Sequence, residues 1–351
     1  MAKNKITTRQ ARNIKARHER LLKTTEEQLP DDSSLGPLLE GTVISRYGKQ
    51  ADVENDADLS VHRCYIRRTV EGLTTGDRVL FRISIKDAAG QNGLVETLKP
   101  RSSLLSRPDY YDGVKPVAAN ITRILIVSTN QPEFSTNIID RYLIACIHCG
   151  VKPVIIVNKS DLFTPEEREK TDIILETYRK IGYESLWIST RTGEGVDSLR
   201  EIIKGETTIL VGQSGVGKSS IINTIIPEAN ASTNSISDIS GLGQHTTTSS
   251  RLYHLPENTT IIDSPGIREF GLWHLSPEEV IRGYPEFLEK TPYCKFRDCK
   301  HLNDPGCAVV EAVKNSEIAE FRFNNYHRII ESMQQNAPSS FSSPGKKTRK
   351  Q

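Results

Sequence analysis

The sequence contains no apolar run long enough to cross a membrane, and its first residues lack the apolar core of a secretory signal. Cysteine is also scarce, with 6 residues in a chain of 351. So few cysteines do not support a disulfide framework, and we expect a reducing, cytoplasmic environment. No internal repeat is present. These absences favour a globular protein that is long enough for two or three domains.

Net charge is small as well, at +2, but it is unevenly distributed. Residues 1–23 contain eight Lys or Arg against one Glu, and residues 346–350 add four more basic side chains. The body between these two arms is therefore acidic. Basic arms on an acidic body indicate a polyanionic partner, although solvated tails without a partner would have the same composition.

Residues 36–105 contain short β-type runs separated by glycine-containing turns. This spacing favours a small closed barrel of the OB type, a fold that often binds single-stranded nucleic acid. Several basic and aromatic side chains could form such a binding face: Arg46, Lys49, Arg63, Tyr65, Arg67 and Arg68. On the strand pattern alone, an ordinary outward face of a barrel remains the simpler interpretation.

From residue 120 to about residue 268, buried-type strands alternate with helical patterns. We expect strands at 124–127, 154–157, 186–188, 209–211 and 261–262, and helices at 136–149, 165–181, 196–203 and 218–226. This alternation predicts a mostly parallel sheet with helices on both faces. Residues 269–335 return to helix and loop, and the Ser-, Pro- and Lys-rich end is predicted to be disordered.

A phosphate-binding motif, G-x-x-x-x-G-K-S, occupies residues 212–219 between a β-rich run and a helical run. Its glycines let backbone N–H groups surround phosphates, and the helix N-terminus adds a favourable dipole. Lys218 is expected to contact the β- and γ-phosphates, and Ser219 to bind Mg²⁺. The predicted contacts are Gly212, Gln213, Ser214, Gly215, Val216, Gly217, Lys218, Ser219 and Ser220.

A base-recognition motif, Asn-Lys-Ser-Asp, follows a hydrophobic strand and belongs at the carboxyl edge of the sheet, where ligands bind. The Asp161 carboxylate can accept both the ring N–H and the exocyclic amine of guanine, a donor pair that adenine lacks. Taken alone, the motif also fits an ordinary polar turn. The predicted GTP contacts are Asn158, Lys159, Ser160 and Asp161, with Ser189 and Thr190 near the guanine carbonyl.

Two further segments fit a nucleotide switch. Asp263 and Gly266 form an Asp-x-x-Gly motif after a strand, and we expect Asp263 to hold Mg²⁺ through water and Gly266 to contact the γ-phosphate. A Ser/Thr/Gly-rich loop at 232–250 contains three consecutive threonines, of which we assign Thr247 to the Mg²⁺ shell beside Ser219. Loops of this kind order on GTP and relax after hydrolysis.

A Cys/His cluster near the C-terminus supplies three thiolates and one imidazole within fourteen residues: Cys294, Cys299, His301 and Cys307. This is a closed tetrahedral zinc set of the structural kind, although unrelated reduced cysteines are the alternative. Lys295, Arg297 and Lys300 lie between the ligands and could contact phosphate.

Together these are the motifs of a regulatory GTPase, but the base motif precedes the phosphate loop, as in a circular permutation. Over residues 36–335 the sequence resembles the ribosome small-subunit-dependent GTPase A family (RsgA, also called YjeQ), with further matching segments at 107–113, 241–248 and 270–273. The resemblance implies a role in late maturation of the small ribosomal subunit, with rRNA, GTP and GDP as partners and subunit-stimulated hydrolysis. We expect a monomer with no membrane association.

The expected organisation is multi-domain: an OB-fold β-barrel, an α/β circularly permuted P-loop GTPase domain and a small α zinc-binding domain. The predicted boundaries are 1–35 for a basic arm, 36–105 for the OB-fold, 106–268 for the GTPase domain, 269–335 for the zinc-binding domain and 336–351 for a disordered basic tail.

The sequence departs from the Ras pattern at the catalytic position. Ile267 follows Gly266, where Ras-like proteins have a glutamine that orients the attacking water. The nearest polar candidate is His245, whose neutral imidazole can accept a hydrogen bond from water, although a surface histidine is the alternative. Two other functions remain open: an RNA-binding protein that uses GTP only as a conformational ligand, and a P-loop ATPase or kinase.

Overall fold

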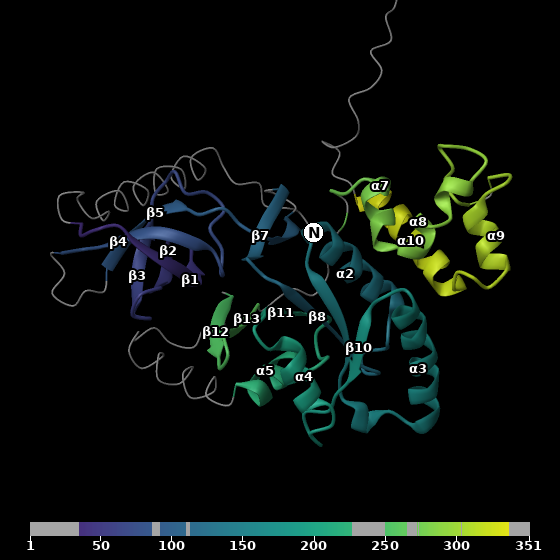
Figure 1. Cartoon of the computed structure of the whole chain (residues 1–351), viewed down its shortest axis with the longest axis horizontal. Coiled ribbons are helices and arrows are strands. Elements are labelled where there is room, and N and C mark those ends of the chain that lie inside the picture. Colours follow the sequence, from purple (N-terminus) through teal and green to yellow (C-terminus); the bar gives the residue numbers. More distant parts are fainter. Residues whose placement is uncertain are drawn as a thin grey trace, which may run out of the picture. The chain divides into compact units, whose positions relative to one another are not determined.

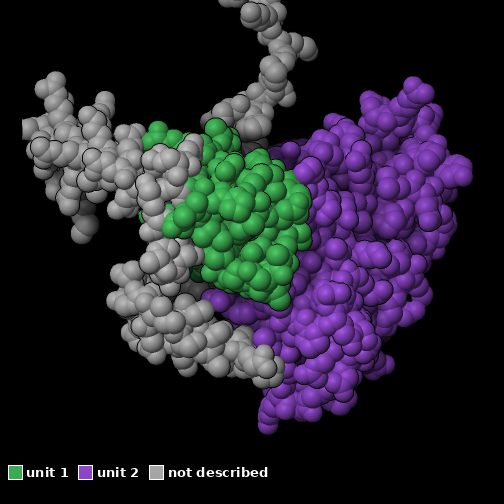
Figure 2. Space-filling model, turned by 60° about the vertical axis from the view of Figure 1, so that its left-hand side comes forward, with its two compact units in different colours: residues 1–42, 47–71, 78–99 green, residues 43–46, 72–77, 100–351 purple. Residues whose placement is uncertain are grey.

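The computed structural model describes residues 35–85, 92–109, 113–226, 250–264, 272, 274–302 and 304–336. The chain forms two compact units, shown in separate colours in Figure 2. The smaller unit takes the described parts of residues 1–42, 47–71 and 78–99, and the larger takes those of 43–46, 72–77 and 100–351. Within these parts, no helix combines the length and the apolar character that a membrane crossing requires.

The smaller unit is built on a closed β-barrel. The strands of the barrel are β1 (Leu39–Tyr47), β2 (Gln50–Asn55), β3 (Val61–Ile66), β4 (Arg78–Ile83) and β5 (Asn92–Leu98), although residues 43–46 of β1 are assigned to the larger unit. They follow the order β1-β2-β3-β5-β4, and β4 pairs back onto residues 39–42 of β1. Small and aliphatic side chains such as Ala51, Val53 and Val79 are fully buried inside. The prediction of an OB-type closed barrel is therefore confirmed.

The larger unit contains the α/β sheet that the sequence predicts. Its strands are β8 (Arg123–Ser128), β9 (Lys152–Val157), β10 (Glu184–Trp187), β11 (Thr207–Val211), β12 (Arg251–Leu255) and β13 (Thr259–Asp263), in the order β10-β9-β8-β11-β13-β12. All neighbours are parallel except β12, which pairs antiparallel with β13. A separate hairpin, β6 (Leu104–Asp109) and β7 (Gly113–Ala119), precedes this sheet.

Helices cover both faces of the sheet (Figure 1). On β8, Ile124 and Ile126 pack into the core shared with α2 (Thr136–Cys149) and α3 (Pro165–Lys180). Leu125 and Val127, on the opposite face of the same strand, pack with α4 (Val196–Ile203) and α5 (Lys218–Ile225). Because successive strand side chains point to opposite faces, a continuous apolar run is what a sheet buried on both sides requires.

The helix ends follow local chemistry. Thr164 caps α3 by accepting the Glu167 N–H, while the Glu167 side chain returns to the Thr164 N–H. Pro165 supplies the first helical residue, where no backbone donor is needed. At its C-terminus, α2 ends at Gly150, which has the left-handed conformation. The Gly150 N–H donates to carbonyl groups of the last helical turn. These signals explain why helix positions could be predicted closely.

The C-terminal segment is helical, as expected, and packs against α2. It contains α7 (Pro277–Val280), η3 (Ile281–Gly283), α8 (Pro285–Leu288), η4 (Thr291–Tyr293), α9 (Ala308–Lys314) and α10 (Glu320–Asn336). Tyr284, Phe287 and Ile329 are completely buried in the same core as Leu143 of α2. The C-terminal helices therefore share one continuous core with this face of the sheet.

A buried ionic network lies within that shared core. Arg322 of α10 donates to Asp140 of α2 at 2.5 Å and to Glu286 of α8 at 2.7 Å. Its side chain is 1% exposed and that of Asp140 is 0% exposed. The guanidinium also lies 4.0 Å from the centre of the Tyr284 ring. Burial alone would lower the pKa of Arg322, but the two carboxylates raise it well above its usual value, so the group stays charged.

We predict that Arg322→Ala lowers the free energy of unfolding by about 3–5 kcal/mol, because it leaves two buried carboxylates without a counter-charge. Lys170→Ala, which removes an exposed partner of Glu166 on α3, is the control and is expected to change stability little. Chemical denaturation followed by circular dichroism measures both. Equal stability of the two variants would contradict the prediction.

Candidate functional site

The predicted nucleotide contacts in the described chain gather at one edge of the sheet. Asn158 directly follows β9 and Gly212 directly follows β11, Ser189 lies two residues after the end of β10, and Asp263 is the last residue of β13. These four strands are parallel, so their carboxyl ends lie at the same edge. In the sheet, β9 lies on one side of β8 and β11 lies on the other, so the direction in which strands are added reverses at β8. Such a reversal is where open α/β sheets bind ligands.

The phosphate loop, residues 212–217, leads directly from β11 into α5. Gly212 and Gly217 have φ angles of 144° and 95°, a region that favours glycine. A Cβ on Gly212 would lie 2.3 Å from the Val127 carbonyl oxygen, and one on Gly217 would lie 2.3 Å from Asn158 Nδ2. Lys218 Nζ donates to the carbonyls of Gly212 and Gln213 at 2.7 Å each. The ammonium is thus held against the loop that is predicted to receive phosphates.

Hydrogen bonds join the predicted base motif to this loop. Asn158 is 1% exposed and donates from Nδ2 to the Val216 carbonyl at 2.9 Å. Lys159 has a φ of 59° and donates from Nζ to the Gly215 carbonyl at 2.7 Å. The two motifs are separated by more than fifty residues in the sequence, yet they form one bonded surface. The predicted base contacts and the predicted phosphate contacts therefore lie on one surface.

Asp161, the residue predicted to select guanine, lies in the short helix η2 (Ser160–Leu162). Its Oδ1 accepts the Ser189 hydroxyl at 2.6 Å, and Oδ2 faces Arg191 at 3.5 Å. Ser189 is completely buried, and its Oγ also accepts the N–H groups of Arg191 and Thr192. Asp161 is therefore held against the loop that contains Ser189 and Thr190, with the carboxylate aligned by a buried hydroxyl.

A second hydrogen-bonded connection between these two loops was not predicted from the sequence. Ser160 Oγ donates to Oε2 of Glu194, whose Oε1 accepts Arg168 of α3 at 2.7 Å. The Arg168 and Ser160 hydrogen bonds lower the pKa of Glu194, so it remains a carboxylate at neutral pH. Glu194 lies in a Gly-rich turn that carries no recognisable motif. Only the Asp161-containing motif and the short Ser-Thr-Arg segment were visible in the sequence.

Asp263, predicted to hold Mg²⁺ through water, lies at the end of β13. Burial raises its pKa, and the nearby positive charge of Lys218 opposes that rise. The acid is therefore electrostatically coupled to the phosphate loop. Ser219 lies in the first turn of α5, directly after Lys218, and is exposed. His245, Thr247 and Gly266, the other predicted catalytic, magnesium and γ-phosphate contacts, lie outside the described residues.

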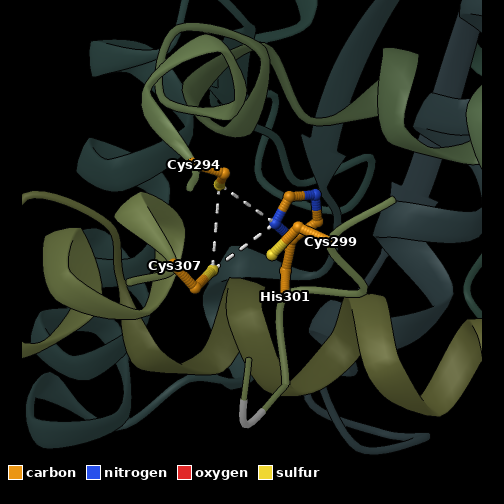
Figure 3. Close-up of side chains that lie close together, drawn as sticks. All are labelled: Cys294, Cys299, His301 and Cys307. Carbon is orange, nitrogen blue, oxygen red and sulfur yellow. Dashed lines mark hydrogen bonds between the residues drawn. The ribbon is translucent and has the colours of Figure 1, made fainter. Parts of the chain in front are cut away.

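The Cys/His cluster forms a compact donor set in the C-terminal helical segment (Figure 3). The four ligand atoms of Cys294, Cys299, His301 and Cys307 all lie within 4.8 Å of one another. His301 Nδ1 lies 3.7 Å from the Cys294 sulfur and 3.5 Å from the Cys307 sulfur. Two thiolates at ~2.3 Å from one tetrahedral ion would be ~3.8 Å apart, and the sulfurs of Cys294 and Cys307 are 4.0 Å apart. The spacing therefore fits a single zinc ion.

The surroundings of this cluster also favour a cation. His327 Nε2 donates to the His301 carbonyl at 2.9 Å, which fixes the backbone that carries this ligand. Cys307 caps the N-terminus of α9, where its sulfur accepts the Val310 N–H. Burial and the neighbouring Cys307 raise the pKa of the Cys299 thiol to about 12, a cost that a bound divalent cation removes. The residues fit a closed structural zinc site.

The order of these elements defines the class of protein. A parallel sheet carries a base-binding loop, then a phosphate loop, and then the Asp263 strand, so the chain has the fold of a circularly permuted P-loop GTPase. The family model described as RsgA GTPase matches residues 98–273. The chain belongs to this RsgA GTPase family.

Individual relatives agree with the family assignment. The chain is 52% identical to a protein of Photorhabdus laumondii over 96% of this chain and 97% of that one, and 52% identical to one of Yersinia enterocolitica with the same coverage. Both are named small ribosomal subunit biogenesis GTPase RsgA. Among solved structures, YjeQ from Thermotoga maritima is similar at 30% identity and a TM-score of 0.68, covering 85% of this chain and 99% of that one. The circularly permuted GTPase YloQ is similar at 28% identity and a TM-score of 0.64, with 88% and 99% covered.

We predict that Asp161→Asn weakens GTP binding by about ten- to a hundredfold and improves binding of xanthosine triphosphate, because an amide can donate to the xanthine oxygen. Asp197→Asn is the matched control, since that side chain is 97% exposed on α4. Titration of fluorescent guanine and xanthine nucleotides measures both. Unchanged guanine affinity in Asp161→Asn would remove this residue from the site.

For the cluster, we expect one tightly bound Zn²⁺ per chain and loss of that zinc in Cys299→Ala. Cys149→Ala, outside the donor set, should retain it. In Cys299→Ala, hydrogen exchange relative to wild type should speed up more in residues 274–302 than in the phosphate loop. The reason is that metal binding stabilises the fold around the metal. Freshly purified protein without zinc in elemental analysis would contradict the assignment.

Proposed function

We propose that this chain hydrolyses GTP to GDP while bound to the small ribosomal subunit, during late maturation of that subunit. The observation that carries the proposal is the bonded surface between the base motif and the phosphate loop, formed by Asn158 and Lys159 on Val216 and Gly215. A surface of this kind is suited to one purine nucleoside triphosphate. The names of the relatives supply the biological context, since both are small ribosomal subunit biogenesis GTPases.

The proposed nucleotide site follows from the same surface. Guanine pairs with Asp161, and the phosphates lie along the loop and Lys218. Ser219 and Thr247 bind Mg²⁺, Asp263 holds it through water, and Gly266 contacts the γ-phosphate. The full set of GTP contacts is Asn158, Lys159, Ser160, Asp161, Ser189, Thr190, Gly212, Gln213, Ser214, Gly215, Val216, Gly217, Lys218, Ser219, Ser220, Asp263 and Gly266.

The carboxylate of Asp161 is what favours GTP over ATP. Adenine would leave this acceptor without its paired donors, at a cost of several kcal/mol in a desolvated site. The buried Ser189 hydroxyl supports this role, because it holds Oδ1 and limits the ways in which the carboxylate can turn away. An ATPase or kinase is therefore the weaker alternative.

A role on the ribosome also requires surfaces that bind RNA. On the barrel, Arg63 stacks on Tyr47 at 4.8 Å and is paired with Asp52, and Arg67 is paired with Glu96. These ion pairs partly neutralise the face that the sequence suggested. Near the zinc cluster, Tyr293 is 78% exposed and Phe296 is 44% exposed, beside the basic residues Lys295, Arg297 and Lys300. Exposed aromatic and basic side chains support binding of RNA at this second surface.

We propose the domain boundaries expected above: a basic arm at 1–35, an OB-fold at 36–105, a permuted GTPase domain at 106–268, a zinc-binding domain at 269–335 and a basic tail at 336–351. The proposed cofactors are one structural Zn²⁺ on Cys294, Cys299, His301 and Cys307, and Mg²⁺ with GTP. We also propose that the chain acts in the cytoplasm as a monomer, without membrane association.

The test is single-turnover GTP hydrolysis with and without small ribosomal subunits, at two salt concentrations. Subunits should accelerate hydrolysis by at least about tenfold, because a bound partner can order the catalytic loop before reaction. Deleting residues 1–35 should weaken subunit binding and reduce its salt dependence, since fewer counterions are released. Hydrolysis that subunits leave unchanged would favour the RNA-binding alternative, in which GTP is only a conformational ligand.

His245→Ala refines this test. If His245 accepts a hydrogen bond from the attacking water, the variant should bind GTP and subunits normally but lose about a hundredfold or more of the stimulated rate. His254→Ala, at a position on β12 with no predicted role, is the control. Wild-type stimulated turnover in His245→Ala would assign the catalytic group to the ribosome instead.

A further inference from the structure

Ser250 is the first described residue after the Ser/Thr/Gly-rich segment and lies directly before β12. Its carbonyl oxygen accepts two side-chain hydroxyls, Ser45 Oγ at 2.9 Å and Thr75 Oγ1 at 3.1 Å. Ser45 is 1% exposed and Thr75 is 2% exposed, so water does not compete for either bond. Ser45 also pairs with Arg251, the next residue of the chain. The C-terminal end of the segment is therefore anchored at a buried point.

Ser250 is also hydrogen-bonded to the Asp-x-x-Gly motif. Its own hydroxyl donates to Ser264 Oγ at 3.1 Å, and Ser264 is 6% exposed. Ser264 directly follows Asp263, whose charge is coupled to Lys218. Three hydroxyl contacts thus run from Ser45 and Thr75, through Ser250, to the residue beside the predicted magnesium ligand.

The two donors are themselves held rigidly. Asp77 accepts Arg101 at 2.6 Å and 2.8 Å and also accepts the Thr74 N–H at 2.7 Å, which closes the loop 72–77. That loop is bonded to β1 through Val43, which donates its N–H to the Asp77 carbonyl and accepts the Gly76 N–H. Asp77 is completely buried. Ser45 and Thr75 therefore belong to one hydrogen-bonded support, from which their hydroxyls reach the Ser250 carbonyl.

We propose that Ser45 and Thr75 are positioning residues for GTP hydrolysis, acting through Ser250 and Ser264 to hold Asp263 where it can orient Mg²⁺. This inference rests on the proposed function, because it assumes that the site hydrolyses GTP. Neither residue lies in the phosphate or base loop, so we expect GDP binding to be retained when they are changed. Removing the two hydroxyls is expected to shift the metal relative to the reacting phosphate. A displacement of about 1 Å at such a position can lower the rate about a hundredfold.

The test compares wild type with Ser45→Ala/Thr75→Val, which removes both donors, and with Thr75→Ser, which keeps a hydroxyl at the second position. Thr74→Val is the matched control. Its hydroxyl lies in the same loop and is also buried, but it donates to the Val117 carbonyl instead of to Ser250. For each protein we measure the thermal midpoint, the GDP and GTP affinities, and single-turnover hydrolysis with saturating subunits across a Mg²⁺ titration.

The double variant should bind GDP as wild type does, hydrolyse GTP about ten- to a hundredfold more slowly and need more Mg²⁺ for half-maximal rate. Thr75→Ser and Thr74→Val should behave as wild type. If the double variant does not fold, Thr75→Val alone should show the same split between rate and affinity.

A double variant, or a folded Thr75→Val, with wild-type rate and Mg²⁺ requirement overturns the inference. An equal loss of rate in Thr74→Val also overturns it, because general loosening of the loop would then explain the effect. Wild-type protein that does not hydrolyse GTP would instead refute the proposed function, so the two failures are distinguishable.

Discussion

The site depends on one geometric constraint, the parallel pairing of β8, β9, β11 and β13. Parallel strands place their carboxyl ends at one edge, so the loops that follow must lie together whatever their order in the sequence. This is why a permuted chain can retain the site. Moving the base motif ahead of the phosphate loop changes the connections but not the edge at which Asn158 and Gly212 emerge.

Hydrogen bonds across that edge then make the loops into one surface. Lys159 and Asn158 bond to the phosphate loop, and Asp161 and Ser160 bond to Ser189 and Glu194. A second set of contacts, through Ser250 and Ser264, joins the Asp263 strand to a support outside the nucleotide loops. Preorganisation of this kind lowers the ordering cost of binding and reaction. We therefore expect mutations in the second set of contacts to change hydrolysis more than nucleotide affinity.

Much of this could be predicted from the sequence, because the signals are local. The helix at Thr136–Cys149 matched its prediction, since its apolar spacing and Gly150 lie within one segment. The Cys/His set was visible from spacing alone, and its four donors do lie together. By contrast, Glu194 and the Arg322–Asp140 pair were not predicted. Arg322 and Asp140 are 182 residues apart in the sequence, and the packing of α10 on α2 brings the two side chains together.

The central claim is that the joined surface of base motif and phosphate loop holds a guanine nucleotide. Competition for bound fluorescent GDP tests it most directly. GTP and GDP should displace the probe at similar concentrations, and ATP should fail to do so even at about a thousandfold excess, because Asp161 would lose its paired donors. Displacement by ATP at concentrations close to those of GTP would contradict the account.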